Sequence, residues 1–201
     1  MEKEYALTGD LVLHAWVDES MQMPSRDRDG LYLLAAAVAS PTACDPMRDN
    51  LRGLLLKGTR RLHWRDESAP RRAKIASAIA EHDLVHVVVV GAPIDAKKQE
   101  RARRLCLERL VFELGMLDVS RVWLESRTQS LNTRDRRMFA ALHAKQAMPA
   151  ALHIDFALPT DEPMLWVADA VAGAVGQARR GSNLDIRDSL GPGIDEIEIQ
   201  L

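Results

Sequence analysis

Four carboxylates lie either at the end of an apolar segment of the chain or within one. Asp18 and Glu19 follow the apolar run at residues 11–17, and Glu125 closes a second, shorter apolar run. Asp169 lies among apolar residues in a segment expected to be helical. Hard divalent cations such as Mg²⁺ and Mn²⁺ need several carboxylate oxygens that converge on one spot. These side chains are therefore candidates for metal chemistry if the fold brings them together.

The run at residues 11–17 is almost wholly apolar and too short for a good helix. Together with the β-branched Val12 and Val17, this predicts a strand that is buried on both faces and central in its sheet. A carboxylate at the end of such a strand sits over the rim of the sheet, where α/β proteins build their sites. The alternative interpretation of Asp18 is a strand that ends in an ordinary polar turn.

The remaining pattern predicts an α/β chain of one domain over residues 1–201. Further strands are expected at 31–39, 84–90, 120–125 and 151–157, and helices at 95–117, 132–145 and 160–180. Residues 41–82 form a helical insertion after the second strand, since apolar side chains recur there at helical spacing. The tail at 181–201 starts as a loop, and its last eight residues alternate apolar and acidic side chains. That alternation predicts an edge strand or an element that pairs with another chain.

The last of these helices places Asp169 on a face that is otherwise small and apolar. Leu165, Ala172, Gly173 and Gly176 share this face by their spacing. An aspartate there is costly to bury unless it is paired, hydrogen-bonded or bound to metal. No Lys or Arg lies within one turn of it on that face. A role for Asp169 in a functional site is therefore favoured over a purely structural role, in which it would only be hydrogen-bonded within the fold.

Composition excludes several classes of protein. The chain has 201 residues, 47% of them hydrophobic, with 27 basic and 29 acidic side chains. Neither a membrane span of roughly 20 apolar residues nor a signal peptide is apparent. The two cysteines have neither disulfide-framework nor metal-ligand spacing, which is typical of a reducing compartment. We expect a soluble, cytoplasmic protein with no membrane partner.

The element order, three antiparallel strands and then alternating helices and strands, is that of the ribonuclease H-like fold, with a mixed five-stranded sheet flanked by helices. Three motifs also resemble those of the DUF3800 family. They are Val17-Asp-Glu-Ser20 after the first strand, Leu62-His63, and Leu165-Trp-Val-Ala-Asp-Ala-Val-Ala-Gly173 on the last helix. The chain departs from the family pattern at Met21 and Trp166, where glycine and glutamine are usual, and Glu125 stands where aspartate is commoner.

The resemblance implies a metal-dependent nuclease. Phosphodiester hydrolysis is assisted by paired Mg²⁺ or Mn²⁺ ions about 3.5–4 Å apart. Asp18, Glu125 and Asp169 are the expected ligands. Glu19 ranks second as a catalytic residue, because strand alternation turns it to the opposite face. His63 is expected at the rim, to contact phosphate or assist product release; the alternative is a capping or surface histidine.

Five arginine clusters would indicate a polyanionic partner if several of them line the same rim as the carboxylates. They are Arg60-Arg61, Arg71-Arg72, Arg101 with Arg103-Arg104, Arg134 with Arg136-Arg137, and Arg179-Arg180. Arginine suits bidentate phosphate contacts, so RNA, DNA or a hybrid is the expected partner. The alternative for each cluster is solvated helix surface. Two other functions stay open: a catalytically degenerate ribonuclease H-like binding module, and an interaction protein that forms a homo-oligomer through its C-terminal strand.

Overall fold

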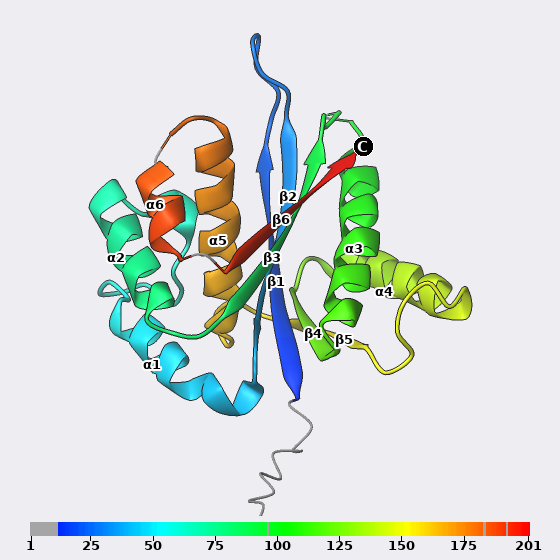
Figure 1. The fold of residues 1–201 in the computed structure, drawn as a ribbon, viewed down its shortest axis with the longest axis horizontal. Coiled ribbons are helices and arrows are strands. Elements are labelled where there is room, and N and C mark those ends of the chain that lie inside the picture. The colour runs from blue at the N-terminus through cyan, green and yellow to red at the C-terminus, as the bar shows by residue number, and fades with distance from the viewer. Residues whose placement is uncertain (1–11, 96, 183, 192) are drawn as a thin grey trace, which may run out of the picture.

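A single mixed sheet with helices on both faces forms the protein (Figure 1). The computed structural model describes residues 12–95, 97–182, 184–191 and 193–201. The strands are β1 (Leu13–Gln22), β2 (Leu31–Ala39), β3 (Val85–Ala92), β4 (Val119–Glu125), β5 (His153–Ala157) and β6 (Ile194–Gln200). The helices are α1 (Asp45–Gly53), α2 (Ala69–Ala80), α3 (Gln99–Met116), α4 (Gln129–Ala144), α5 (Met164–Arg179) and α6 (Leu184–Ser189), with 3-10 turns η1 (Pro41–Ala43) and η2 (Trp64–Asp66).

The strands are ordered β5-β4-β1-β2-β3-β6. Strand β2 pairs antiparallel with both β1 and β3, whereas β4 runs parallel to β1, β5 parallel to β4, and β6 parallel to β3. The predicted mixed α/β architecture, with helices flanking the sheet, is confirmed. The predicted count of five strands is wrong, because β6 pairs with β3 along its length and extends the same sheet to six strands.

Strand β1 is longer than its apolar pattern predicts. We expected it to end at Val17, but β2 keeps pairing with it as far as Gln22. Pairing with β4, in contrast, ends at Val17 opposite Leu124. Asp18 and Glu19 therefore lie within a strand, at the point where its parallel neighbour ends. The expected start of the strand, at Leu11, lies outside the described residues.

The sheet separates two apolar cores. Trp16 of β1 belongs to the core beneath α5, whereas Ala15 and Val17 belong to the core beneath α3. Figure 1 shows α1, α2, α5 and α6 on one face and α3 and α4 on the other. Because side chains alternate along a strand, Asp18 faces the α5 layer and Glu19 faces the α3 layer.

The segment between β2 and β3 reaches back onto α5. It holds η1, α1, η2 and α2, where the sequence predicts a helical insertion. The ring of Trp64 rests against Gly173 so closely that a Cβ there would lie 2.1 Å from the Trp64 Cδ1 atom. This contact brings residues 61–65 beside the end of the β1–β4 ladder. None of the helices in the described part of the chain has the length and apolar character that crossing a bilayer requires.

The tail is more ordered than its composition indicates. Residues 181–193, rich in Gly, Ser and Asn, were expected to form a loop, yet they include helix α6. Ile186 explains the difference, because it packs against the core beneath α5. Of the two apolar side chains in this six-residue helix, Leu184 is exposed and Ile186 packs inward, which leaves little periodic signal in the sequence.

Candidate active site

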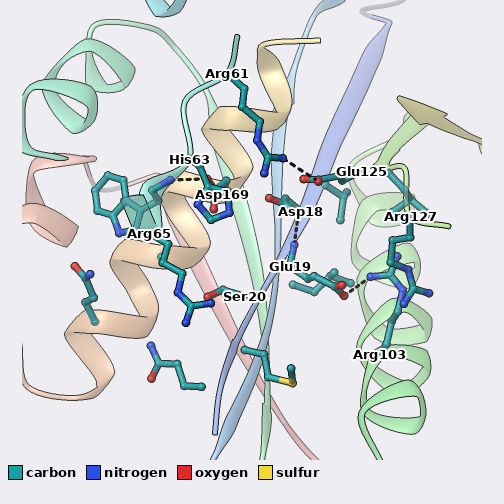
Figure 2. A pocket seen from close by; sticks show the side chains of 18 of the residues that line it. Asp18, Glu19, Ser20, Arg61, His63, Arg65, Arg103, Glu125, Arg127 and Asp169 are labelled. Atoms are coloured by element: carbon teal, nitrogen blue, oxygen red, sulfur yellow. Dashed lines mark hydrogen bonds and ion pairs between the residues drawn. The ribbon is translucent and has the colours of Figure 1, made fainter. Parts of the chain in front are cut away.

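A pocket of about 440 Å³ opens where β4 ends beside β1. Its lining includes the five candidate catalytic residues Asp18, Glu19, His63, Glu125 and Asp169. These residues come from β1, from the segment before η2, from β4 and from α5. The fold thus gathers into one cavity residues that are far apart in the sequence (Figure 2).

Asp18 and Glu125 form the centre of this pocket. They directly follow Val17 and Leu124, which are partners in the parallel ladder, so the two carboxyls leave neighbouring strands at the same level. Burial raises the pKa of Asp18 well above its usual range, and the charges of Glu125 and Asp169 raise it further. A hydrogen bond from the Glu19 backbone N–H to Asp18 Oδ1, at 2.7 Å, opposes this rise. Without a compensating cation, Asp18 therefore tends to hold a proton.

Asp169 approaches the same pocket from α5. Its Oδ2 atom accepts a hydrogen bond from the backbone N–H of Trp64 at 2.7 Å. Burial raises the pKa of Asp169, while this hydrogen bond and the neighbouring His63 oppose the rise. The aspartate thus has a structural partner in the backbone, which the helix pattern alone did not reveal.

His63 and Arg61 lie above the carboxylates, on the segment that Trp64 anchors (Figure 2). The Nδ1 atom of His63 is buried without a hydrogen-bond partner among the described residues, and it lies 3.6 Å from the Asp66 carboxylate. Arg61 Nη1 lies 3.6 Å from Glu125 Oε1. A histidine and a guanidinium therefore border the acidic centre.

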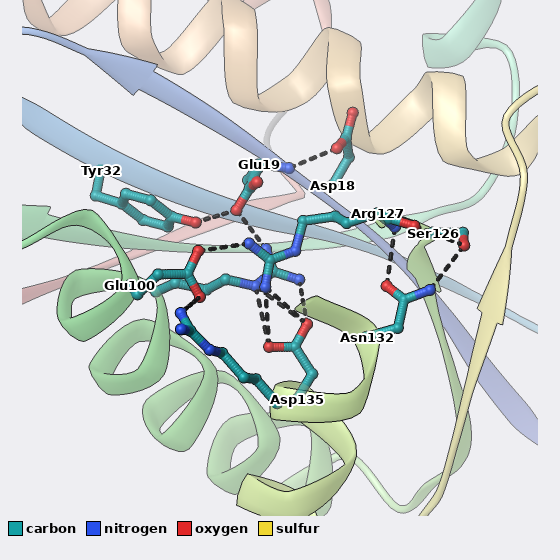
Figure 3. A network of polar contacts seen from close by, with 10 residues as sticks. Asp18, Glu19, Tyr32, Glu100, Ser126, Arg127, Asn132 and Asp135 are labelled. Atoms are coloured by element: carbon teal, nitrogen blue, oxygen red, sulfur yellow. Dashed lines mark hydrogen bonds and ion pairs between the residues drawn. The ribbon is translucent and has the colours of Figure 1, made fainter. Parts of the chain in front are cut away.

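Glu19 belongs to a different set of contacts, on the α3 side of the sheet. Its carboxylate accepts hydrogen bonds from the Tyr32 hydroxyl and from Arg103. Arg103 also pairs with Asp135 at 3.0 Å, and the two side chains are 5% and 6% exposed. Arg127 contacts the same Asp135 carboxylate at 3.1 Å (Figure 3). The structure thus places Glu19 in a buried ionic network rather than beside the Asp18 carboxyl.

Comparisons with known proteins bear on the fold alone. A scan against protein-family models finds no match, and neither does a search of curated proteins. Among solved structures, this chain matches a chain in a structure of the PCNA:RNase HII complex from Archaeoglobus fulgidus. The TM-score is 0.52 at 16% sequence identity, over 91% of this chain and 82% of the other. The shared feature is the fold.

This match fits the predicted ribonuclease H-like architecture, with the sheet enlarged by β6. The resemblance to the DUF3800 family stays a prediction, as do the roles that it implies for individual residues.

Five arginines contribute to the pocket wall: Arg61, Arg65, Arg72, Arg103 and Arg127. Three of them come from the predicted clusters, whereas the clusters at 134–137 and 179–180 lie elsewhere. Arg72 is held in place, because its Nε donates to the Trp64 carbonyl at 2.9 Å. Within the described part of the chain, no carboxylate pairs with the guanidinium of Arg65. The pocket is therefore acidic at its centre and basic around it.

The described residues contain no three His, Cys, Asp or Glu side chains already set as metal ligands. The donor chemistry nevertheless fits a hard cation, because Asp18, Glu125 and Asp169 supply carboxylate oxygens to one pocket. Burial and the two neighbouring carboxylates disfavour the charged form of Asp18, which a cation would stabilise. As they lie, Glu125 faces Arg61 and Asp169 faces the Trp64 N–H. Metal binding would therefore require these carboxylates to turn from their present partners toward a common point.

The buried network of Arg103 and Asp135 is the main feature that the sequence interpretation missed. A signal existed, since Arg103 shares the apolar face of α3 with Leu107, Leu110 and Leu114 at helical spacing. An arginine on such a face predicts a buried partner. The sequence also offers Glu108 and Glu113 of the first long helix as weaker candidates for a fourth carboxylate, but neither lines the pocket. They pair instead with Arg104 and Arg109 along α3.

Proposed function

We propose that this protein is a divalent-metal-dependent nuclease that hydrolyses phosphodiester bonds. The observation that carries the proposal is the placing of Asp18, Glu125 and Asp169 around one pocket, from two parallel strands and the helix that covers them. Bringing three carboxylates so close is unfavourable without a cation. A site with this donor set suits Mg²⁺ or Mn²⁺.

The bound ion would polarise the phosphoryl oxygens and activate a water. Asp18, Glu125 and Asp169 are the residues that would hold it. His63, which lines the same pocket, would contact the phosphate or assist product release. Glu19 acts through Arg103 and keeps β1 fixed against α3, so we assign it a positioning role.

The basic wall supports nucleic acid as the substrate. Arg65 and Arg61 flank the carboxylates (Figure 2), and guanidinium groups bind phosphate in a bidentate manner. The fold match to a structure that contains RNase HII agrees with this assignment. RNA, DNA and RNA–DNA hybrids are the substrates to compare.

The test is a cleavage screen on these three substrates with Mg²⁺ and with Mn²⁺. We expect metal-dependent cleavage by the wild type and at least a hundredfold loss in Asp18→Asn, as one ligand is removed. Asp49→Asn is the matched control, because Asp49 is exposed on α1 and pairs with Arg52, away from the pocket. Glu19→Gln is expected to keep Mn²⁺ binding measured by calorimetry. Absence of cleavage with every substrate and ion would contradict the proposal.

One observation favours a second candidate, a ribonuclease H-like module that binds nucleic acid without cleaving it. Glu125 and Asp169 already have partners within the protein, Arg61 and the Trp64 N–H. Nucleic acid binding that is unaffected by metal, with no cleavage, would favour this role. Homo-oligomer formation through β6 is best tested on the intact chain by analytical ultracentrifugation. Removing β6 would expose the edge of β3, with which it pairs.

A further inference from the structure

Arg61 is the cationic side chain that faces Glu125 in the pocket. The guanidinium lies 3.6 Å from the carboxylate, and the side chains are 41% and 29% exposed. The contact is therefore a single, half-exposed ion pair. Such pairs are weak, because water and salt screen them. Arg61 can leave Glu125 at little cost.

The segment that carries Arg61 is firmly held at its far end. Trp64 donates its backbone N–H to Asp169, its ring packs against Gly173, and its carbonyl accepts from Arg72. The guanidinium can thus change partner while its backbone stays beside the pocket. A long side chain on an anchored segment is suited to exchange between two nearby anions.

We propose that Arg61 is an exchangeable counter-ion of the site: it neutralises Glu125 before metal binds, and a divalent cation displaces it onto the substrate phosphate. The inference rests on the proposed nuclease function and adds to it the coupling between metal and substrate. Arg61 suits both partners, because its planar guanidinium pairs with carboxylate and with phosphate in similar geometry.

The exchange has a thermodynamic consequence. Arg61 competes with the metal for Glu125 when no nucleic acid is present, and it strengthens nucleic acid binding once metal has released it. Metal and nucleic acid therefore increase each other's affinity through one side chain. This coupling is reciprocal, so it can be measured from either ligand.

Arg65 provides a matched control. It lines the same pocket and carries the same charge, but no carboxylate of the described residues pairs with it. Arg61→Gln and Arg65→Gln each remove one positive charge from the wall of the same pocket. Arg65→Gln therefore controls for the loss of one charge from this wall, and a larger effect in Arg61→Gln reports the release of Glu125 from its ion pair.

The first measurement is Mn²⁺ binding by calorimetry without nucleic acid. We expect Arg61→Gln to bind Mn²⁺ about two- to fivefold more tightly than Arg65→Gln, the range expected for removing one half-exposed ion pair. Equal affinities would overturn the inference. Thermal unfolding of both variants verifies that each is folded.

The second measurement is the affinity for a fluorescein-labelled RNA–DNA hybrid with a nuclease-resistant backbone, with and without Mn²⁺. We expect Mn²⁺ to tighten binding in the wild type and in Arg65→Gln by a larger factor than in Arg61→Gln. The same factor in all three proteins would overturn the inference. If the wild type binds no Mn²⁺, the nuclease proposal and this inference both fall. If it binds Mn²⁺ and cleaves nucleic acid, but the two variants behave alike, only the inference falls.

Discussion

The carboxylate of Asp169 accepts the backbone N–H of Trp64 at 2.7 Å, across 105 positions of the sequence. This hydrogen bond joins α5 to the segment that carries Arg61 and His63. The residue that we propose as a metal ligand is thus also the anchor of the basic residues that border the site. Its two roles can be separated, because the amide oxygen of an asparagine can still accept the Trp64 N–H but does not supply the negative charge of a metal ligand.

Asp169→Asn keeps an oxygen that accepts the Trp64 N–H, but it removes a charge whose burial is unfavourable. We expect this variant to be at least as stable as the wild type without metal, and to lose most of the Mn²⁺-induced rise in Tm. Asp169→Ala leaves the Trp64 N–H without a partner and is expected to cost about 1–3 kcal/mol. Thermal and urea unfolding measure both effects. A full Mn²⁺-induced rise in Asp169→Asn would show that Asp169 is not a ligand.

The raised pKa of Asp18 predicts a pH dependence of stability. The native state binds a proton on the Asp18 carboxyl more tightly than the unfolded chain does. The protonated carboxyl therefore makes its full contribution to stability below the ordinary carboxyl pKa of about 4. This contribution is lost as the pH rises through the native pKa. In metal-free protein, wild-type stability should therefore fall relative to Asp18→Asn above about pH 4, by up to about 1.4 kcal/mol per pH unit. Urea unfolding of both proteins across this range is the measurement, and parallel curves would contradict the prediction.

Arg103 is expected to be the most stability-sensitive charged residue of those described here. Replacing it with Met leaves Glu19 without its cation and Asp135 with Arg127 alone. Removing one partner from a buried ionic network costs about 3–5 kcal/mol. The next residue, Arg104, is the control: it is exposed and its pair with Glu108 is long, so Arg104→Met should change the free energy of unfolding by less than about 0.5 kcal/mol. Similar losses in both variants would rule out a special role for the network.

Gly173→Ala tests the close contact between α5 and Trp64. The added methyl group would overlap the indole ring, so Trp64 and the segment before it must move. We expect a loss of about 1–3 kcal/mol from overpacking and weaker nucleic acid binding. Gly53→Ala is the matched control on a helix, since its methyl group would meet no neighbouring side chain of the described residues within 4 Å. It should be neutral or stabilise the protein by up to about 1 kcal/mol.

The sequence was informative where local patterns determine the outcome. Apolar runs located the strands that carry Asp18 and Glu125, and helical spacing located Asp169 on the covered face of α5. Long-range pairing was not accessible in this way. The contact of Arg103 with Asp135 joins residues 32 positions apart on two different helices, and neither local pattern specifies the other partner. The extension of β1 past Val17 depended in the same manner on β2, which continues to supply a partner.

Asp18 and Glu19 are consecutive residues that serve opposite layers of the protein, one in the carboxylate pocket and one with Arg103. A shift of β1 by one residue against β2 would exchange their positions, because side chains alternate between the faces of a sheet. An insertion or deletion inside Leu13–Gln22 would produce that shift for every residue beyond it. Changes of chain length are therefore expected to be confined to the hairpin tip at residues 23–30, while the strand itself must keep its length through sequence divergence.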